Sequence, residues 1–529
     1  MKKIFLSLAG TCLLLPYLLI AQNDSRVYAN SITGADLKKH LSIVASAEME
    51  GRETASEGLK KAAAYIEAQF KLLGLKPPPG NKGNYQQAYP LYRDTVTNAS
   101  LLIGDKNYVF GQDYLVDILS NPSTKMKAKK IIFVGYGISD NNYDDYAGKD
   151  VKDKIVIFFL GEPKKGGIFT ITGTKETSQW TDAGMARKTA LAKERGAAGA
   201  FVINPTMENL PGENILTARR TKLYYPREAV PEIPRVFDAS ISRQVAKDIF
   251  GEAKYLEMAQ KAQETEPLNT ISIESKIRTR LKYEKKKQSY SSTNVIGYLE
   301  GSIKKDEYVV ITAHMDHLGK QGDQIFYGAD DDGSGTVSVM ELAEAFTKAK
   351  TAGSGPSRSI VFMTVSGEEK GLLGSEYYSD NPLFPLEKTT VNLNIDMVGR
   401  IDPTRLKGDS TNYIYVIGDD KLSSELKPIS ERINKQFSNL ELDYKFNDPK
   451  DESRIYFRSD HYNFARKGVP VIFYFSGIHE DYHKVTDVIE KINFNIMEKR
   501  VRLIFHTAWE LANRNEMLKR DIELPAETR

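Results

Sequence analysis

The sequence predicts a mixed α/β fold in which a mainly parallel sheet is sandwiched by helices, with a separate β-rich domain inserted. From residue 294 onward, apolar runs of strand length alternate with stretches of helical periodicity, an order typical of a sheet with helices on both faces. Between residues 129 and 205, apolar runs and turns form a pattern of their own. The length of 529 residues also predicts more than one folding unit, because domains usually have ~100–200 residues.

The elements expected after residue 294 follow from periodicity. β-branched and aromatic runs predict the strands, whereas apolar residues at every third or fourth position, such as Val339, Leu342 and Phe346, predict the helices. An earlier helix is predicted at 55–73, which Gly74 and the prolines at 77–79 end. The strands are expected at 294–299, 308–313, 359–365, 391–396, 413–417 and 469–475, and the helices at 336–349, 371–379 and 495–513.

The boundaries between domains follow from these changes in pattern. The inserted region contains strand patterns at 129–137, 153–161 and 199–205, and no cluster of histidine with carboxylates. The polar segment 283–293 includes three consecutive lysines and is interpreted as a solvated linker. The predicted division is 1–21 as a signal peptide, 22–105 as the first part of the main domain, 106–285 as the insert and 286–529 as the rest of the main domain.

The first 21 residues predict export. They have a short basic start, an apolar run and Ala21 before the expected cleavage point, as secretory signal peptides do. The only cysteine, Cys12, lies inside this segment, so the mature chain would lack thiolate ligands and a cysteine nucleophile. A second long apolar segment is absent from the sequence, which predicts a periplasmic or secreted protein that does not insert in a membrane after cleavage.

The charge balance gives no indication of a strongly acidic partner such as nucleic acid or an anionic membrane. The chain has 73 basic and 70 acidic residues, and removal of Lys2 and Lys3 with the signal peptide would leave 71 against 70. Nucleic-acid-binding proteins usually carry a clear basic excess. The sequence therefore gives no reason to expect nucleic acid as a partner.

A histidine and several acids cluster where the strand at 308–313 ends. His314 and Asp316 are two residues apart, so both side chains project from one face of an extended chain. The carboxylate can accept a proton from one imidazole nitrogen and leave the other free for a metal. The carboxylates of Asp330, Asp331 and Asp332 repel one another, a cost that a cation removes. The alternative is a structural histidine and an acidic N-cap before the helix.

Three more acids follow the next two strands. Glu368 and Glu369 come after the strand at 359–365. Adjacent side chains point in different directions, so one acid can bind metal while the other accepts a proton. A negatively charged helix start is the alternative for this pair. Asp396 ends an otherwise apolar strand, where an unpaired charge would be costly.

The last strand leads into a segment with two histidines, His479 and His483. They form the pattern H-E-x-x-H, which marks zinc metalloproteases when both histidines lie one turn apart on a helix. Here Ser476 and Gly477 precede the pattern, and Thr486 and Asp487 are typical of caps for a later helix. The segment is therefore predicted to be a loop, which argues against that interpretation.

Nitrogen and oxygen ligands without thiolates suit Zn²⁺. Five ligands with one shared carboxylate would hold two ions ~3.5–4 Å apart. The candidate ligands are His314, Asp331, Glu369, Asp396 and His483.

The ordered motifs H-x-D, G-A-D-D-D-G-S-G, S-G-E-E, N-I-D and D-Y-H resemble those of the co-catalytic di-zinc aminopeptidase family. That family includes leucine aminopeptidases, aminopeptidase Y, glutamate carboxypeptidases and, more distantly, glutaminyl cyclases. The motifs lie within residues 294–487. The resemblance implies two Zn²⁺ per chain, with His314 and Asp396 on one ion, Glu369 and His483 on the other, and Asp331 bridging them.

The resemblance also implies roles for other residues. Asp316 would orient His314, and Glu368 would be the general base for the attacking water. The family's Ser-Asp-His segment is matched at 459–461. Tyr456, three residues earlier, would then steady the oxyanion, with Tyr462 as an alternative.

The inserted region resembles the protease-associated domain of many members, through VKDKIVIFFLG and ERGAAGAFVINP. For the whole chain the resemblance implies a secreted metallo-exopeptidase that acts on peptides, most directly an aminopeptidase. Carboxypeptidase or dipeptidase activity stays open, because the metal ligands do not show which end of a peptide is held. Glutaminyl cyclase activity and a non-catalytic protein that keeps the fold are the remaining alternatives.

Overall fold

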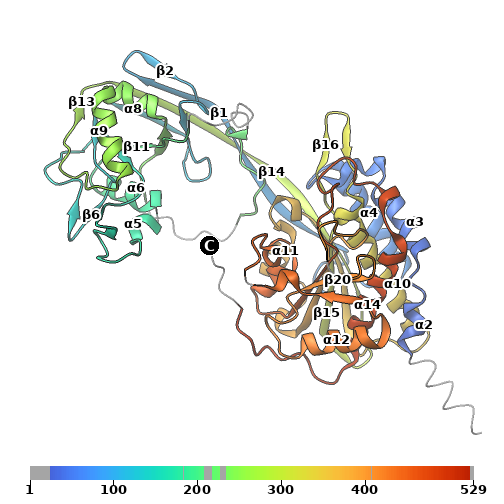
Figure 1. The fold of residues 1–529 in the computed structure, drawn as a ribbon. Helices are drawn as coiled ribbons and strands as arrows, with labels where there is room; N and C mark the ends of the chain where they lie inside the picture. The colour runs from blue at the N-terminus through green and yellow to red at the C-terminus, as the bar shows by residue number, and fades with distance from the viewer. Residues whose placement is uncertain are drawn as a thin grey trace, which may run out of the picture. The chain divides into compact units, whose positions relative to one another are not determined.

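The computed structural model describes residues 24–182, 184–207, 217–226, 234–406, 408–448 and 450–524. The expected signal peptide, 1–21, lies outside the described residues. The chain divides into two compact units, of which the larger takes Met1–Pro90 and Ser291–Arg529 and the smaller takes Leu91–Tyr290 (Figure 1). Among the described helices, none is long and apolar enough to cross a membrane.

The larger unit is built on a mixed sheet in which most neighbouring strands are parallel. The order is β14-β18-β15-β19-β22-β20-β21, and only the β14–β18 and β20–β22 pairs are antiparallel. The predicted fold class is confirmed. The strands are β14 (Thr279–Leu299), β15 (Lys304–His314), β18 (Arg358–Val365), β19 (Thr389–Ile395), β20 (Tyr413–Ile417), β21 (Glu441–Asp443) and β22 (Val471–Phe475).

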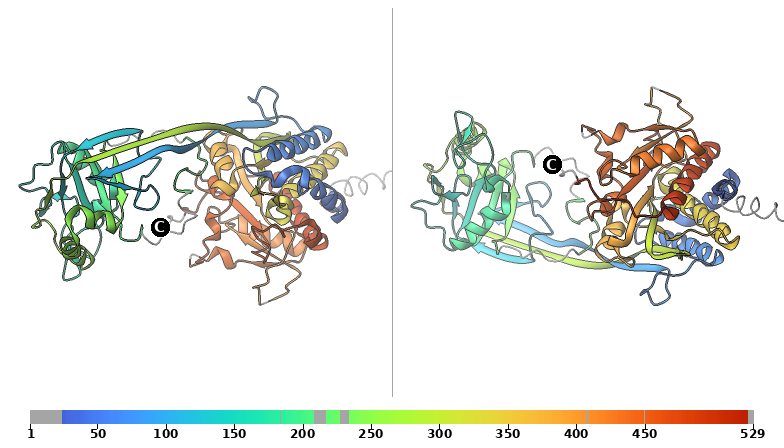
Figure 2. Two further views of the ribbon diagram at one scale, coloured as in Figure 1. Left: turned by 90° about the horizontal axis from the view of Figure 1, so that it is seen from above. Right: turned by 90° about the horizontal axis from the view of Figure 1, so that it is seen from below.

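Helices cover both faces of this sheet because its strands are apolar on both sides. Along β15, Val309 and Ile311 pack into one core, whereas Val310 packs into the other. Figures 1 and 2 show α3, α4, α10 and α14 together on one face, with α11 on the opposite side. The helices are α2 (Ser25–Ala29), α3 (Gly34–Val44), α4 (Glu57–Leu72), α10 (Gly335–Thr351), α11 (Leu373–Asp380), α12 (Leu426–Phe437), α13 (His461–Ala465) and α14 (Phe494–Asn513).

The smaller unit has its own core around a six-stranded sheet, in the order β13-β5-β8-β11-β12-β3. The apolar runs at 153–161 and 199–205 form its parallel central pair, β8 and β11. Its identity as a protease-associated domain stays a prediction. The elements are β3 (Tyr114–Leu115), β5 (Ile131–Phe133), β8 (Ile155–Phe159), α5 (Gln179–Asp182), α6 (Gly184–Glu194), β11 (Gly199–Ile203), β12 (Asp238–Ile241), α8 (Arg243–Phe250), α9 (Glu252–Gln263) and β13 (Glu274–Ser275).

The unit boundaries lie at 90/91 and 290/291, whereas the sequence pattern predicts 105/106 and 285/286. Two long strands, β1 (Gln86–Ile103) and β14, pass these boundaries without a break. The segment 283–293, interpreted as a solvated linker, contains the boundary at 290/291, but it lies wholly within β14 and is therefore a strand. Its residues 286–289 are exposed one after another, so neither strand face is covered there and polar side chains are tolerated.

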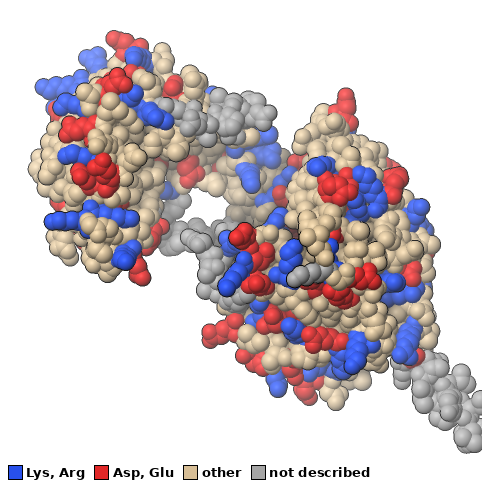
Figure 3. All heavy atoms as spheres, in the orientation of Figure 1, with Lys and Arg blue, Asp and Glu red and all other residues tan. Residues whose placement is uncertain are grey.

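On the visible face of each unit, basic and acidic side chains are interspersed (Figure 3).

The remaining described strands are short, with two to five residues each. The short strands are β2 (Lys106–Tyr108), β4 (Thr124–Ala128), β6 (Ser139–Asp140), β7 (Tyr143–Asp144), β9 (Lys164–Lys165), β10 (Ile168–Phe169), β16 (Gly319–Gln321) and β17 (Gln324–Phe326).

Candidate metal centre

The predicted ligands meet at one edge of the large sheet. His314 ends β15, Glu369 follows β18, and Asp396 follows β19 directly. These three strands are parallel neighbours, so their carboxyl ends lie at the same edge. Asp331 comes from the turn Ala329–Ser334 before α10, and His483 comes from the segment after β22.

His314, Asp331 and Asp396 form a first group. Nε2 of His314 lies 3.3 Å from Oδ1 of Asp331 and 3.6 Å from Oδ1 of Asp396. The three side chains are buried, and their ligand atoms lie within 4.8 Å of one another. An ion in this group would have one nitrogen and two oxygen ligands.

Glu369 and His483 form a second group on the other side of Asp331. Nε2 of His483 lies 3.1 Å from Oδ2 of Asp331 and 3.2 Å from Oε2 of Glu369. Asp331 therefore presents Oδ1 to the first group and Oδ2 to the second. This is the geometry of a shared carboxylate, and all five predicted ligands are brought together.

Sequence reasoning missed a third histidine, His317. Its Nδ1 lies 2.8 Å from Oε1 of Glu369 and 3.7 Å from Oδ2 of Asp331, and the side chain is fully buried. The signal was present, since His317 follows directly after Asp316. The H-x-D motif is complete with His314 and Asp316, so the motif alone gives the next histidine no role.

These groups fit a metal because their polar atoms lack partners. Buried polar atoms in proteins are almost always hydrogen-bonded. Among the described residues, Oδ2 of Asp331, Oε1 of Glu369 and both ring nitrogens of His317 are buried without a hydrogen bond. These atoms converge on one another, and nitrogen with carboxylate oxygen is a donor set that suits Zn²⁺.

The close packing of acids and histidines in and beside the two groups shifts the pKa values of some of them. Burial raises the pKa of Glu368 well above its usual range, and the nearby Glu369 and Asp396 add to this effect while His314 opposes it. Burial opposes a charge on His483, but its contacts with Asp331 and Glu369 outweigh burial and raise its pKa to about 10. A bound cation would reverse this balance, because it favours ionised carboxylates and neutral imidazoles.

The carboxylate of Asp316, expected to orient His314, makes its hydrogen bonds to other groups. Its Oδ2 accepts a hydrogen bond from Thr54 Oγ1 at 2.6 Å, and its Oδ1 accepts one from the main-chain N–H of Glu368 at 3.2 Å. Nδ1 of His314 instead lies 3.0 Å from the main-chain carbonyl oxygen of Asp316 and 3.8 Å from the carboxylate. The carbonyl therefore orients His314, since the carboxylate is occupied by Thr54 and Glu368.

A buried arginine supports the site from the N-terminal part of the chain. Arg52, at the end of the short helix Ala47–Arg52, is fully buried and donates hydrogen bonds to four carbonyl oxygens. Two of them, on Met315 and Gly328, lie 2.8 and 2.9 Å away and belong to the strand end and the acidic turn. The other two belong to Val44 and Tyr327. No sequence motif marks this residue.

The other two acids of the turn accept hydrogen bonds from main-chain N–H groups. Asp332 accepts hydrogen bonds from the main-chain N–H groups of His314 and Gly335, at 3.1 and 2.8 Å. Asp330 accepts one from the N–H of Gly399 at 2.6 Å. The carboxylate of Asp331 is therefore the one in this turn that is turned toward both groups.

The segment with His479 is not helical, so the H-E-x-x-H interpretation fails, as predicted. Nε2 of His479 lies 3.4 Å from Oδ2 of Asp330 rather than beside His483. The expectation that Asp487 caps a following helix is wrong. Its carboxylate accepts hydrogen bonds from the N–H groups of Asp330 and Asp331, at 3.1–3.2 Å, and so fixes the acidic turn.

A small cavity, open to solvent, lies beside the first group. Tyr456 is not among its lining residues. Its short helix, Ile455–Phe457, turns Ile455 toward the cavity and Tyr456 toward the core, where its hydroxyl has no partner among the described residues. The lining residues are His314, Asp331, Glu368, Asp396, Met397, Ile455, Arg458, Phe473, Phe475, Ile478 and Tyr482.

Tyr482 is the tyrosine that lines the cavity. Its ring stacks on that of His483 with centroids 3.8 Å apart, and a guanidinium nitrogen of Arg458 lies 3.4 Å from its hydroxyl. Tyr462, the alternative from the sequence, does not line the cavity either. The D-Y-H motif contained the signal, since Tyr482 immediately precedes His483.

Comparisons with known proteins agree with this picture. Residues 294–508 match the model of peptidase family M28. Leucine aminopeptidase 1 of Penicillium rubens is 28% identical over 215 residues, which cover 39% of this chain and 53% of that protein. Leucine aminopeptidase 1 of Trichoderma harzianum is 27% identical over 248 residues, which cover 45% and 59%. The chain thus spans little more than half the length of these two relatives.

The aminopeptidase from Aneurinibacillus sp. strain AM-1 has a similar fold. Its structure matches 95% of this chain and 100% of its own with a TM-score of 0.51, at 18% sequence identity. The family match covers β15, β18, β19 and β22 together with every side chain of the two groups. On this match, the part of the chain that carries the candidate metal centre belongs to peptidase family M28.

Proposed function

We propose that this chain is an aminopeptidase that binds two zinc ions and removes N-terminal residues from peptides. One observation carries the proposal: buried histidine and carboxylate atoms without hydrogen-bond partners face one another beside a cavity. The names of the two matched relatives, both leucine aminopeptidases, support the choice of reaction.

In this proposal His314 and Asp396 hold one ion, Glu369 and His483 hold the other, and Asp331 is shared. The two groups fit these assignments, because each oxygen of Asp331 lies within 3.3 Å of a histidine nitrogen. When bound, the ions supply Lewis-acid chemistry that polarises a peptide carbonyl and makes a water more acidic.

Glu368 is the group that moves protons. It lines the cavity, with Oε2 at 3.9 Å from Nε2 of His314, and its main-chain N–H is anchored on Asp316. We assign Glu368 Oε2 the proton of the attacking water, which it then delivers to the leaving amine. Such general acid–base transfers contribute ~10²–10⁴ in rate.

Tyr482 is the donor that we assign to the substrate carbonyl. Its side chain lines the cavity, whereas Tyr456 is turned into the core. Burial raises the pKa of Tyr482 above its usual value, so the phenol keeps its proton and can donate it in a hydrogen bond. Fixed donors of this kind stabilise the charge that develops on the carbonyl oxygen.

The rest of the cavity suits an apolar side chain at the peptide's first position. Carboxylates line the same cavity and would attract the ammonium group of a free N-terminus. The apolar lining residues are Met397, Ile455, Phe473, Phe475 and Ile478.

A carboxypeptidase is the second candidate, because Arg458 also lines the cavity. An arginine fork pairs well with a free C-terminal carboxylate. The two candidates differ in the peptide end that must be unblocked.

Hydrolysis of matched peptides tests the proposal. Peptides that begin with Leu, with a free or an acetylated N-terminus, are compared with and without a chelator. We expect cleavage of the free peptides only, loss of cleavage with the chelator and recovery with added zinc. Undiminished cleavage of acetylated peptides would instead assign a carboxypeptidase, and Arg458→Gln should then raise KM.

We also propose that the protein is exported, on the basis of the apolar segment at 1–21, and that the insert is a protease-associated domain. N-terminal sequencing of the protein from its native source tests the first part. A mature chain that begins at Gln22 is expected, and retention of Met1 would contradict export by a cleaved signal.

A further inference from the structure

A second cluster of ligating side chains lies on the helical face of the larger unit. His40 on α3 faces Glu341 and Glu344, which are one turn apart on α10. Ligand atoms of the three residues lie within 4.8 Å of one another. Glu341 is six residues along α10 from Gly335, or about 9 Å from the acidic turn at 1.5 Å per residue. The cluster is thus separate from the metal centre.

Glu341 is buried without a partner. Its side chain is 1% exposed, and Oε1 makes no hydrogen bond among the described residues. A lone buried carboxylate is too costly to stay ionised, and burial raises the pKa of Glu341 to about 8. The site therefore requires either a proton on Glu341 or a cation beside it.

The position of His40 distinguishes these two possibilities. Its Nε2 lies 3.6 Å from Oε1 of Glu341, which is too far for a hydrogen bond from a protonated carboxyl. Two ligands of one tetrahedral ion, each ~2.0–2.1 Å from it, lie about 3.4 Å apart. The observed separation is therefore closer to that of two ligands on one ion.

His40 is also oriented as metal-bound histidines are. Its other nitrogen, Nδ1, lies 2.7 Å from the hydroxyl of Tyr65 on α4, which fixes the ring and directs Nε2 toward Glu341. Burial and the nearby Lys39 lower the pKa of His40, so the ring is neutral and its lone pair is available. Lys348 pairs with Glu344 at 2.5 Å on the outer side of the cluster.

We propose that His40, Glu341 and Glu344 form a third divalent-cation site, suited to Zn²⁺, that ties α3 to α10. Solvent supplies the fourth ligand at Glu344, which is the half-exposed member of the set. The role is structural, because α3 comes from the start of the chain and α10 begins at the acidic turn of the metal centre. This site does not depend on the proposed peptidase activity.

Zinc content tests this proposal. Wild-type protein and the variants His40→Gln and Glu341→Gln are loaded with Zn²⁺, desalted and measured by mass spectrometry of the metal. We expect each variant to bind one zinc fewer than wild type and to keep wild-type turnover. Glu57→Gln, at an exposed glutamate on neighbouring α4, is the control and should keep the full count.

A thermal measurement separates a cation from a proton. Zinc added to chelator-treated wild type should raise the unfolding temperature by more than it does in His40→Gln. Equal zinc counts and equal zinc-induced shifts in wild type and both variants would overturn the proposal and assign Glu341 a proton. Loss of the metal centre itself is distinguished by Asp331→Asn, which removes zinc but leaves His40 and Glu341 intact.

Discussion

Buried carboxylates from the two units, Asp145 in the smaller and Asp331 and Glu369 in the larger, differ in their hydrogen bonds. In the smaller unit, Asp145 is fully buried and accepts three hydrogen bonds. The N–H groups of Tyr136 and Ile138 donate to its Oδ2 at 2.9 and 3.1 Å, and the hydroxyl of Tyr143 donates to its Oδ1 at 2.7 Å. Burial still raises its pKa to about 6. Both oxygens of this carboxylate therefore accept hydrogen bonds from the protein itself, and these bonds fix the turn at 136–145.

In the larger unit, Asp331 and Glu369 are buried beside histidines and have oxygens that nothing in the described chain satisfies. The difference shows that burial alone does not mark a functional carboxylate. A functional carboxylate is indicated when its oxygens lack hydrogen-bond donors and lie close to other buried polar atoms that also lack partners.

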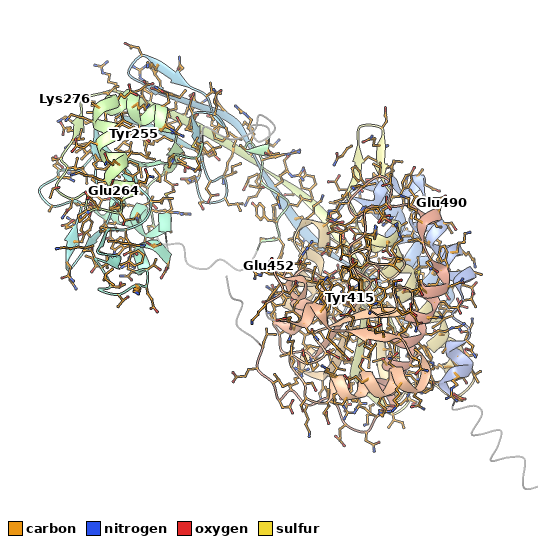
Figure 4. All side chains as sticks on the ribbon, in the orientation of Figure 1. Tyr255, Glu264, Lys276, Tyr415, Glu452 and Glu490 are labelled. Carbon is orange, nitrogen blue, oxygen red and sulfur yellow. The ribbon has the colours of Figure 1, made fainter. Side chains whose placement is uncertain are left out.

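The largest effect is expected from Glu368→Gln. Glu368 lies in the cavity but belongs to neither ligand group, so its loss should remove proton transfer and leave the metal in place. We expect turnover to fall by at least ~10²–10⁴ with zinc content unchanged, measured on the same preparation. Glu490→Gln, at an exposed glutamate of the larger unit (Figure 4), is the control. Wild-type turnover in Glu368→Gln would remove this residue from its role.

Two tyrosines test whether a buried hydroxyl without a hydrogen-bond partner is by itself a sign of a catalytic role. Tyr456 and Tyr482 differ in position, since only Tyr482 lines the cavity. Tyr482→Phe should lower kcat by ~10²–10³ if its hydroxyl stabilises the developing charge. Tyr456→Phe should leave kcat close to wild type, although its hydroxyl also lacks a partner among the described residues. The reverse order of effects would restore Tyr456 as the oxyanion group.

Matched amides at Asp331 and Asp145 test the comparison itself. Asp331→Asn removes the charge that both ligand groups share, so zinc should be lost with little change in the stability of the metal-free protein. Asp145→Asn should keep zinc and lose about 1–3 kcal/mol of stability, because an amide nitrogen replaces one acceptor. Zinc content and unfolding in denaturant are the measurements. Zinc loss in Asp145→Asn, or full zinc content in Asp331→Asn, would break the comparison.

His317→Gln is expected to have an intermediate effect. The ring lies 2.8 Å from an oxygen of Glu369 and 3.7 Å from one of Asp331, so it either ligates the second ion or holds Glu369 in place. Both roles predict zinc affinity about 10–100-fold weaker at one of the two ions, measured by competition with a chromophoric chelator. Unchanged affinity at both ions would make His317 a packing residue only.

A pH dependence of stability is also expected in the smaller unit. The pKa of Asp145 is about 6 in the folded protein and about 3.8–3.9 when unfolded. The folded state therefore holds this proton more tightly, and its contribution to stability is lost as pH rises from about 4 to 6. The free energy of unfolding should fall by about 3 kcal/mol over this range. Asp145→Asn should not show this pH dependence.

Tryptophan fluorescence can isolate this effect. The chain has two tryptophans, and Trp180 lies in α5 of the smaller unit. In a Trp509→Phe background, denaturant unfolding followed through Trp180 at pH 4 and pH 6 reports that unit. An identical pH dependence before and after the further change Asp145→Asn would contradict the raised pKa.

Much of the larger unit could be predicted because its elements are strongly periodic. The runs that form β15, β18 and β19 end at or just before residues of the centre, and parallel strands end at one edge. Arg52 and Thr54 could not be predicted, because they reach the site from a distant segment through hydrogen bonds that no motif marks. The strand conformation of 283–293 could not be predicted, because the segment has the polar composition of a solvated linker, whereas strand pairing uses only the backbone.

The direction of the Tyr456 side chain also could not be predicted from the sequence. A phenol close to a motif can point either way from a three-residue helix, and packing of Ile455 toward the cavity decides the direction. By contrast, His317 and Tyr482 adjoin the predicted ligands in the chain. Both could be predicted by asking which residues flank each motif.

Anomalous diffraction at the zinc absorption edge, from crystals of zinc-loaded protein, would locate the two proposed ions. We expect one anomalous peak between His314, Asp331 and Asp396, and a second between Asp331, Glu369 and His483. If crystals show no peak at either place after zinc loading, these residues do not form a zinc centre.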